Sequence, residues 1–200
     1  TSRDIIIYLS IKFKGNWNKI YETFATRDPE TKTIPDTLDD ETEIKKILKN
    51  IKSEVVTILD EEYPDSLKTI RKPPFCLFYH GDISLLDCKF KSIAVVGSRK
   101  FSAYGASSTK DLVSELAKEL IIISGMARGI DSIAHQSALN AKGKTIAVLG
   151  SGINYVYPSE NKELYEKIKK EGLVISEYYD ETPPSQDHFP WRNRIVVGLT

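Results

Sequence analysis

Ile93-Ala-Val-Val-Gly-Ser-Arg99 is the first of three short apolar runs that each stop at a glycine. The other two are Ile121-Ile-Ile-Ser-Gly125 and Thr145-Ile-Ala-Val-Leu-Gly150, and helical patterns separate all three. None alternates cleanly with polar residues, which is typical of parallel strands buried on both faces. A fourth run of the same character covers residues 173–176. This order of strands and helices predicts an α/β fold, a parallel sheet with crossover helices.

The polar and glycine-rich residues of this stretch follow the predicted strands directly. In open α/β sheets, ligands bind beyond the carboxyl ends of the strands, so we expect these turns to meet along one edge. Glycines permit close backbone approach, and N–H groups at helix starts favour anions. With Arg99 and Arg128 added, the pattern predicts a phosphate site; the alternative is that the glycines only end strands. The turns are residues 97–99, 125–131, 150–152 and 176–177.

No cofactor is indicated by the glycine spacing, which is neither G-x-G-x-x-G nor a Walker loop. The 200 residues are 40% hydrophobic and 28% charged, with zero net charge, which is typical of an ordinary globular chain. Nucleic acid would therefore be bound by a local pocket of arginines and not by a global field. No apolar run approaches the roughly 20 residues of a membrane span, and no signal peptide is visible. Cys76 and Cys88 lack metal or redox spacing, so we interpret them as core thiols of a cytoplasmic protein.

Two domains are expected. Residues 1–54 form a small helical N-terminal module, from helical patterns at residues 4–25 and 39–52, with packing or protein contact as its role. Residues 55–200 form the sheet domain. It begins with strands at 55–59 and 75–79, the second expected to be antiparallel at the sheet edge. Further helices are predicted at residues 104–120, 131–141 and 160–170, the last capped by Ser159 and ended by Gly172.

Asp131 and His135 lie four residues apart on one face of a predicted helix. They could be a general acid or base with its orienting partner. They could equally be a carboxylate at a helix start that holds a histidine in the scaffold. No third ligand lies at a suitable spacing, so no metal site is expected.

Phe189-Pro-Trp-Arg-Asn-Arg194 opens the last predicted helix. Arginines behind aromatic residues suit phosphate binding combined with base stacking. Core packing is the alternative for Phe189 and Trp191. The absence of an acid close in sequence favours a ligand-binding role for Arg192 and Arg194.

In combination these motifs resemble the DNA-processing protein A (DprA/Smf) family of bacteria. The resemblance covers residues 58–200, and residues 1–55 resemble the family's helical N-terminal domain only loosely. The matching segments include Val95-Val96-Gly97-Ser98-Arg99, Ser124-Gly125-Met126-Ala127-Arg128-Gly129-Ile130-Asp131, Ala134-His135, Gly150-Ser151-Gly152, Tyr157-Pro158, Asn161, Ser176-Glu177 and Phe189-Pro190-Trp191-Arg192-Asn193-Arg194.

The resemblance implies an extended Rossmann-type fold that binds single-stranded DNA without an enzymatic step. It further implies protection of incoming strands in natural transformation, assistance in loading the RecA recombinase, and a homodimer. Arg99 would hold a phosphate and Phe189 could support a base, while Asp131, His135 and Glu177 would be scaffold. The DNA-contact candidates are Gly97, Ser98, Arg99, Gly125, Arg128, Gly129, Phe189, Arg192, Asn193 and Arg194.

Two departures from the family pattern stand out. The family's Rossmann domain continues where this chain stops at Thr200, so we expect the domain to be incomplete at its C-terminal end. The loop before Phe189 has Asp187 where many relatives carry a lysine. The competing hypothesis is a Rossmann-type nucleotide hydrolase that uses His135, Asp131 or Glu177, although the glycine-rich loop of such hydrolases is not visible.

Overall fold

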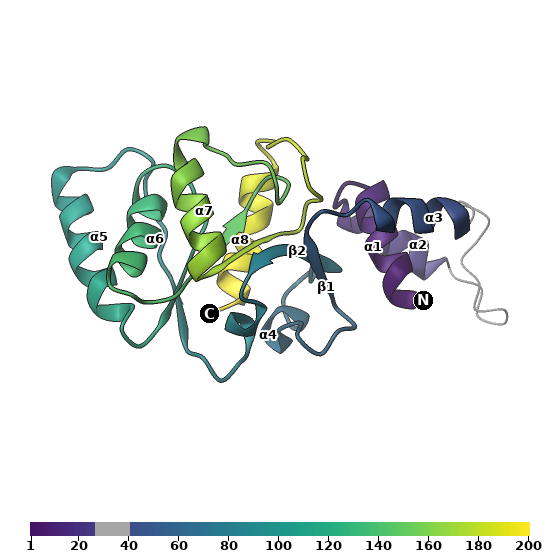
Figure 1. Ribbon diagram of the computed structural model, residues 1–200, viewed down its shortest axis with the longest axis horizontal. Coiled ribbons are helices and arrows are strands. Elements are labelled where there is room, and N and C mark those ends of the chain that lie inside the picture. Colours follow the sequence, from purple (N-terminus) through teal and green to yellow (C-terminus); the bar gives the residue numbers. More distant parts are fainter. Residues whose placement is uncertain (27–40) are drawn as a thin grey trace.

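A computed structural model describes residues 1–26 and 41–200 (Figure 1). A helical module of α1, α2 and α3 precedes a sheet domain, and the two lie at opposite ends of the long axis. The helices are α1 (Ser2–Lys12), α2 (Trp17–Ala25), α3 (Glu41–Lys49), α4 (Asp65–Lys68), α5 (Ala103–Leu116), α6 (Ile130–Asn140), α7 (Lys162–Glu171) and α8 (His188–Gly198). The strands are β1 (Glu54–Thr57), β2 (Cys76–Gly81), β3 (Ser92–Ala94), β4 (Ile121–Ser124), β5 (Thr145–Leu149) and β6 (Leu173–Ser176).

The six strands form one sheet in the order β1-β2-β6-β5-β4-β3. Strands β3 to β6 are parallel to one another, as their apolar runs predicted. Strand β2 pairs antiparallel with β6, and β1 pairs antiparallel with β2. The prediction that residues 75–79 are antiparallel is therefore confirmed, but their expected place at the sheet edge is wrong. That edge is taken by β1, whose register places Val55 opposite Phe78.

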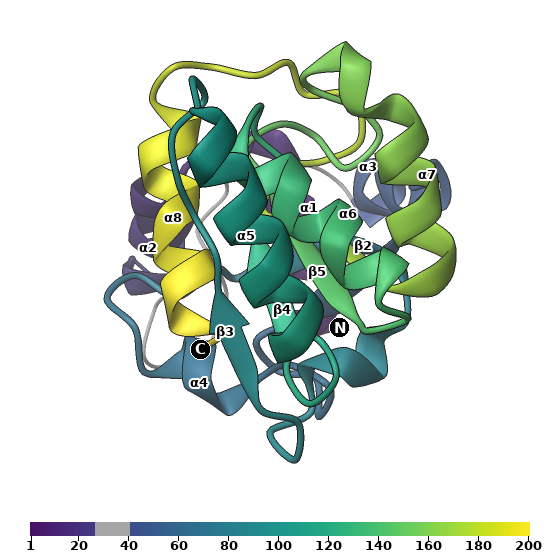
Figure 2. The same ribbon diagram turned by 90° about the vertical axis from the view of Figure 1, so that its left-hand side faces the viewer.

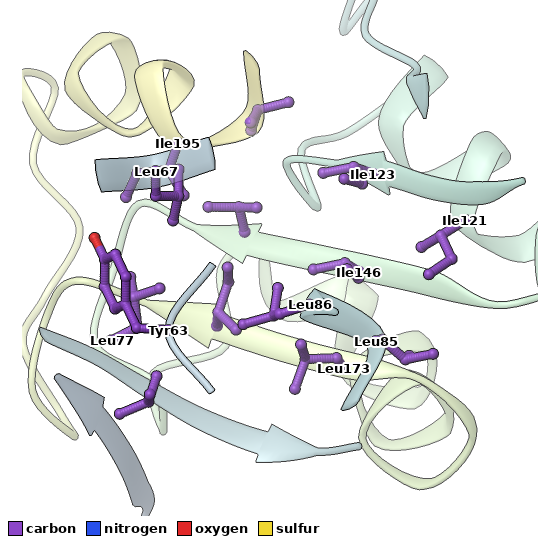
Figure 3. Close-up of a cluster of buried hydrophobic side chains, with 14 residues drawn as sticks. Tyr63, Leu67, Leu77, Leu85, Leu86, Ile121, Ile123, Ile146, Leu173 and Ile195 are labelled. Atoms are coloured by element: carbon purple, nitrogen blue, oxygen red, sulfur yellow. The ribbon is translucent and has the colours of Figure 1, made fainter. Parts of the chain in front are cut away.

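Helices cover both faces of the sheet, which explains the unbroken apolar strands. Figure 2 shows α5, α6 and α7 side by side across one face. On the other face α4, α8 and a 3-10 turn (Ile83–Leu86) pack together. Within β4, Ile121 and Ile123 point to the α8 face and belong to the same buried cluster as Leu67, Leu86 and Ile195 (Figure 3). Ile122, between them, packs under α5 and α6.

The helical module is joined to the sheet domain by specific contacts. Arg3 in α1 donates from Nε to both carboxylate oxygens of Asp60 at 3.0 Å, and from Nη2 to the Val55 carbonyl at 2.8 Å. Trp17 in α2 stacks near Phe75, with ring centroids 5.4 Å apart. Phe24 packs against the same Phe75 ring. The module is thus fixed to the segment that leads into β2.

Element boundaries differ from the sequence prediction at a few positions. The helix expected at 39–52 is α3, and residues 39–40 lie outside the described residues. Ser159 does not cap α7: a 3-10 turn (Ser159–Asn161) comes first, and Asn161 occupies the cap position without a side-chain cap bond. Gly172 ends α7 as predicted. Cys76 is buried but Cys88 is exposed, so the interpretation as core thiols holds for Cys76 alone.

Candidate functional site

The turns that follow β3 and β4, together with Tyr157 from the segment after β5, meet the first turn of α8 around a groove of about 710 Å³. These turns lie together at the top of Figure 2, at the carboxyl ends of the parallel strands. Of the turns predicted to converge, those at 97–99 and 125–131 line this groove, whereas those at 150–152 and 176–177 are not among its lining residues. We call this the rim groove, lined among others by Arg99, Ala127, Tyr157, Gln186, Phe189 and Asn193.

Arg99 is the exposed cation of the rim groove. Its guanidinium carbon lies 5.4 Å from the centroid of the Phe189 ring, and that ring lies 5.7 Å from the ring of Tyr157. Among the residues that the structure describes, no carboxylate lies within ion-pair distance of Arg99. A free guanidinium beside two aromatic rings offers a phosphate partner and stacking surfaces together.

The turn after β4, residues 125–129, is fixed by hydrogen bonds to Asp131 and by close packing against the turn after β3. One carboxylate oxygen of Asp131 accepts from the backbone N–H of Gly125 at 3.1 Å and of Ala127 at 3.4 Å. Gly129 has φ +82°, and a Cβ there would lie 2.3 Å from the Ser98 carbonyl oxygen. Only glycine allows the two turns to approach this closely. Asp131 thus organises the turn.

Arg128 lies beside the rim groove but is already paired. Its Nε and Nη2 donate to the two carboxylate oxygens of Glu160 at 2.6 and 2.8 Å, a bidentate geometry. The hydrogen bonds raise the pKa of Arg128 and lower that of Glu160. Both side chains are more than half exposed, so a phosphate can compete with Glu160 for the guanidinium.

Arg192 forms part of the floor of the rim groove and is buried, with 5% of its surface exposed. Its Nη1 donates to the carbonyl of Gly125 at 2.7 Å and to the carbonyl of Val148. Burial lowers the pKa of Arg192 to about 10, with Asp131 opposing the shift, so the group stays charged at neutral pH. The structure therefore places Arg192 beneath the rim, joining the ends of β4 and β5, and not at the surface where the sequence pattern placed it.

Arg194 points away from the rim groove, although Asn193 lines it. Its Nη2 donates to Glu177 at 2.6 Å, and its Nε donates to the Lys72 carbonyl at 3.0 Å. Glu177 is 5% exposed and also accepts from Trp191 Nε1 at 3.0 Å. Burial raises the pKa of Glu177, and Arg194 opposes that shift. The expectation that Arg192-Asn193-Arg194 has no compensating acid is wrong, because Glu177 supplies it.

His135 is fully buried. The carboxylate of Asp131 accepts from backbone N–H groups of the turn after β4, and that of Glu177 accepts from Trp191 and Arg194. The Thr145 hydroxyl donates to the Ile122 carbonyl at 2.7 Å, so it accepts from His135 Nδ1 at 2.7 Å. Burial lowers the pKa of His135 to about 3, which keeps the ring neutral. These three residues therefore do not form a joint acid–base centre in the rim groove, as the hydrolase alternative requires.

Three contributors to the site were not among the predicted site residues. Glu160 pairs with Arg128, Tyr157 lines the rim groove, and Asn161 donates from Nδ2 to the Met126 carbonyl at 2.9 Å. All three come from the segment between β5 and α7. The Tyr157-Pro158 and Asn161 motifs were visible in the sequence, but nothing there linked them to Arg128. Within residues 1–26 and 41–200, no cluster of His, Cys, Asp or Glu is arranged to hold a metal ion.

The sheet order and the rim groove define the class: an extended Rossmann-type protein whose ligand edge carries a free arginine beside aromatic rings. In residues 1–26 and 41–200, no helix combines the length and the apolar character needed to cross a membrane. The sequence model of the family described as DNA recombination-mediator protein A matches residues 54–200. The chain belongs to this family.

Curated relatives carry the names DprA and Smf. The DNA processing protein DprA of Streptococcus pneumoniae is 48% identical over 143 residues, which are 72% of this chain and 50% of that protein. DprA of Bacillus subtilis is 41% identical over 150 residues, which are 72% of this chain and 49% of that protein. The chain thus spans about half the length of these relatives.

Two solved structures share the fold. The X-ray structure of DprA from S. pneumoniae matches with a TM-score of 0.77 and 38% identity, covering 100% of this chain and 70% of that one. A structure of DNA processing protein A from Helicobacter pylori matches with a TM-score of 0.66 and 33% identity, covering 74% and 67%. The second structure concerns the single-stranded DNA binding mode of the H. pylori protein.

Proposed function

We propose that this chain binds single-stranded DNA in the rim groove, without a covalent step, as part of DNA processing for recombination. The observation that carries the proposal is Arg99: an exposed guanidinium 5.4 Å from the Phe189 ring, with no carboxylate partner in the described part of the chain. In this role Arg99 contacts a phosphate, Phe189 and Tyr157 support bases, and Gly97, Ser98 and Asn193 bring polar groups to the strand. The choice of ligand is supported by relatives named for DNA processing and by the single-stranded DNA binding of the H. pylori protein.

Single strands suit this groove better than a duplex. Stacking on aromatic rings requires an exposed base face, which an unpaired strand offers and a duplex does not. The chain's net charge is zero, so the chain as a whole exerts no net attraction on the phosphates of a duplex. We therefore expect affinity for single strands to exceed affinity for duplexes and to fall with salt.

The test is a fluorescence-anisotropy titration of labelled single- and double-stranded oligonucleotides. Arg99→Ala should weaken single-strand binding about tenfold, whatever the base sequence. The matched control is Lys118→Ala. It removes an exposed cation that follows the C-terminal end of α5, near the amino-terminal ends of the parallel strands and thus on the far side of the sheet from the rim groove. Equal binding by wild type and Arg99→Ala contradicts the proposal. Release of free base from nucleotides would support the hydrolase alternative.

Membership of the family supports a proposal for the wider role. We propose that the protein protects incoming strands, assists RecA loading and acts as a homodimer, with residues 1–54 as a distinct module before the sheet domain. Strand β1 begins at Glu54, next to that boundary. RecA-dependent strand exchange with and without the protein tests the loading role, and light scattering of the purified chain tests the dimer. Limited proteolysis that leaves the sheet domain intact would support the boundary.

A further inference from the structure

A second groove, of about 410 Å³, lies where the helical module meets α8. We call it the junction groove. Its walls come from the turn between α1 and α2, from the segment before β2, and from the start of α8. Among its lining residues are Lys14, Trp17, Lys72, Tyr178, His188 and Trp191.

The first turn of α8 separates the junction groove from the rim groove. Phe189 and Pro190 line the rim groove, whereas His188 and Trp191 line the junction groove. Gln186 and Asp187, which precede them, divide in the same way. A DNA strand that occupied both grooves would therefore pass over a single helical turn.

Aromatic rings in the junction groove are fixed before any ligand arrives. Trp17 Nε1 donates to the Pro73 carbonyl at 2.7 Å, and Trp191 Nε1 donates to Glu177 at 3.0 Å. The rings of Tyr178 and His188 stack with centroids 4.0 Å apart. Rings held in this way lose little conformational freedom when a base stacks on them.

Two lysines bring positive charge to the same place. The Lys72 ammonium lies 5.3 Å from the Trp17 ring and 5.5 Å from the Trp191 ring, and it donates to the Asn18 side-chain oxygen at 2.8 Å. Lys14 is exposed on the turn between α1 and α2. In the described part of the chain, neither lysine has a carboxylate within ion-pair distance. The lining includes one carboxylate, Asp187, whose negative charge partly offsets that of the two lysines.

We propose that the junction groove is a second nucleotide subsite on the path of the same DNA strand. A base packs against the aromatic lining of the junction groove, and the adjoining phosphates contact Lys14 and Lys72. This inference rests on the proposed function, because the strand reaches the junction groove from the rim groove. It assigns a DNA-binding role to the α1–α2 turn, for which the sequence pattern indicated only packing or protein contact.

The test compares oligothymidylates of increasing length by anisotropy. Wild-type affinity should rise in two stages, as the strand fills first the rim groove and then the junction groove. The double variant Lys14→Gln/Lys72→Gln should match wild type on the shortest strands that bind. On long strands it should bind about 3- to 10-fold more weakly, with a salt slope smaller by about 0.7 for each phosphate that is no longer neutralised. Lys118→Gln is the matched control.

The outcomes separate the two proposals. If the double variant equals wild type at every length while Arg99→Ala binds weakly, the junction subsite is wrong and the rim groove stands. If Arg99→Ala also equals wild type, the proposed function fails. Photocrosslinking of 5-iododeoxyuridine strands, followed by peptide mapping, gives an independent reading. Crosslinks to Trp17 or Trp191 with long strands support the subsite, and crosslinks confined to the rim groove contradict it.

Discussion

Replacing Arg192 by methionine tests whether this buried arginine stabilises the turns beneath the rim groove. The change keeps a long apolar side chain and removes the guanidinium that donates to the Gly125 and Val148 carbonyls. These carbonyls lie at the ends of β4 and β5, under the rim groove. Each buried carbonyl left without a donor costs about 1–3 kcal/mol. The desolvation of Arg192 itself, seen in its lowered pKa, offsets part of this loss.

We therefore expect Arg192→Met to lower the free energy of unfolding by roughly 2–4 kcal/mol. For a chain of this size, each kcal/mol corresponds to about 2–4 °C in melting temperature. Circular dichroism during thermal and urea unfolding measures the change. Single-strand affinity should fall as well, because the turn after β4 loses its support from below.

Arg99→Ala is the matched comparison, since it also removes one guanidinium near the same groove. Arg99 is exposed, so its loss should change unfolding free energy by less than about 0.5 kcal/mol while weakening DNA binding. The supporting role of Arg192 is refuted if Arg192→Met leaves the unfolding midpoint unchanged and still abolishes binding. That result would mean that Arg192 reaches the ligand directly.

Three other expectations concern single residues. Glu160→Gln frees Arg128 for phosphate, so single-strand affinity should rise about 2- to 5-fold by anisotropy, and weaker binding would contradict the competition. Gly129→Ala places a Cβ 2.3 Å from the Ser98 carbonyl at φ +82°, so the urea midpoint should fall by the equivalent of roughly 2 kcal/mol or more; an unchanged midpoint would show that the turn relaxes freely. The pKa of His135 is lowered from 6.5 to about 3 in the folded chain, so protonation favours the unfolded chain as pH falls through that window. Between these two pKa values, the free energy of unfolding of wild type should fall by about 1.4 kcal/mol per pH unit relative to His135→Asn. Parallel pH profiles of unfolding free energy for the two proteins would contradict this role of His135.

The fold was largely predictable because its parallel strands are buried on both faces. Strands β4, β5 and β6 occupy the apolar runs at 121–124, 145–149 and 173–176 with the predicted bounds. The sequence predicts a strand over residues 93–96, but β3 ends at Ala94, since the apolar run continues into the exposed turn, where Val96 is 64% exposed. An apolar run shows where a strand can form but not where its pairing stops.

The position of the rim groove was predictable from topology, whereas the partners of Arg128, Arg192 and Arg194 were not. Residues two apart on a helix point in widely different directions, so Arg192 and Arg194 could not both face one ligand. Arg192 reaches the ends of β4 and β5, and Arg194 reaches Glu177. Arg128 finds Glu160 across 32 positions of sequence. Such pairings depend on how loops meet in space, which spacing along the chain does not report.

Hydrogen exchange with and without an oligothymidylate tests binding at the rim groove most directly, because it reports where on the chain the strand lies. We expect slower exchange in residues 97–100 and 125–129, beside the rim groove, and in residues 186–193, the segment that contributes to both grooves. The exchange rates of residues 142–145 and 171–173, at the amino-terminal ends of β5 and β6, should be unchanged. Protection at these amino-terminal ends, with the rim turns unaffected, would contradict binding at the rim groove.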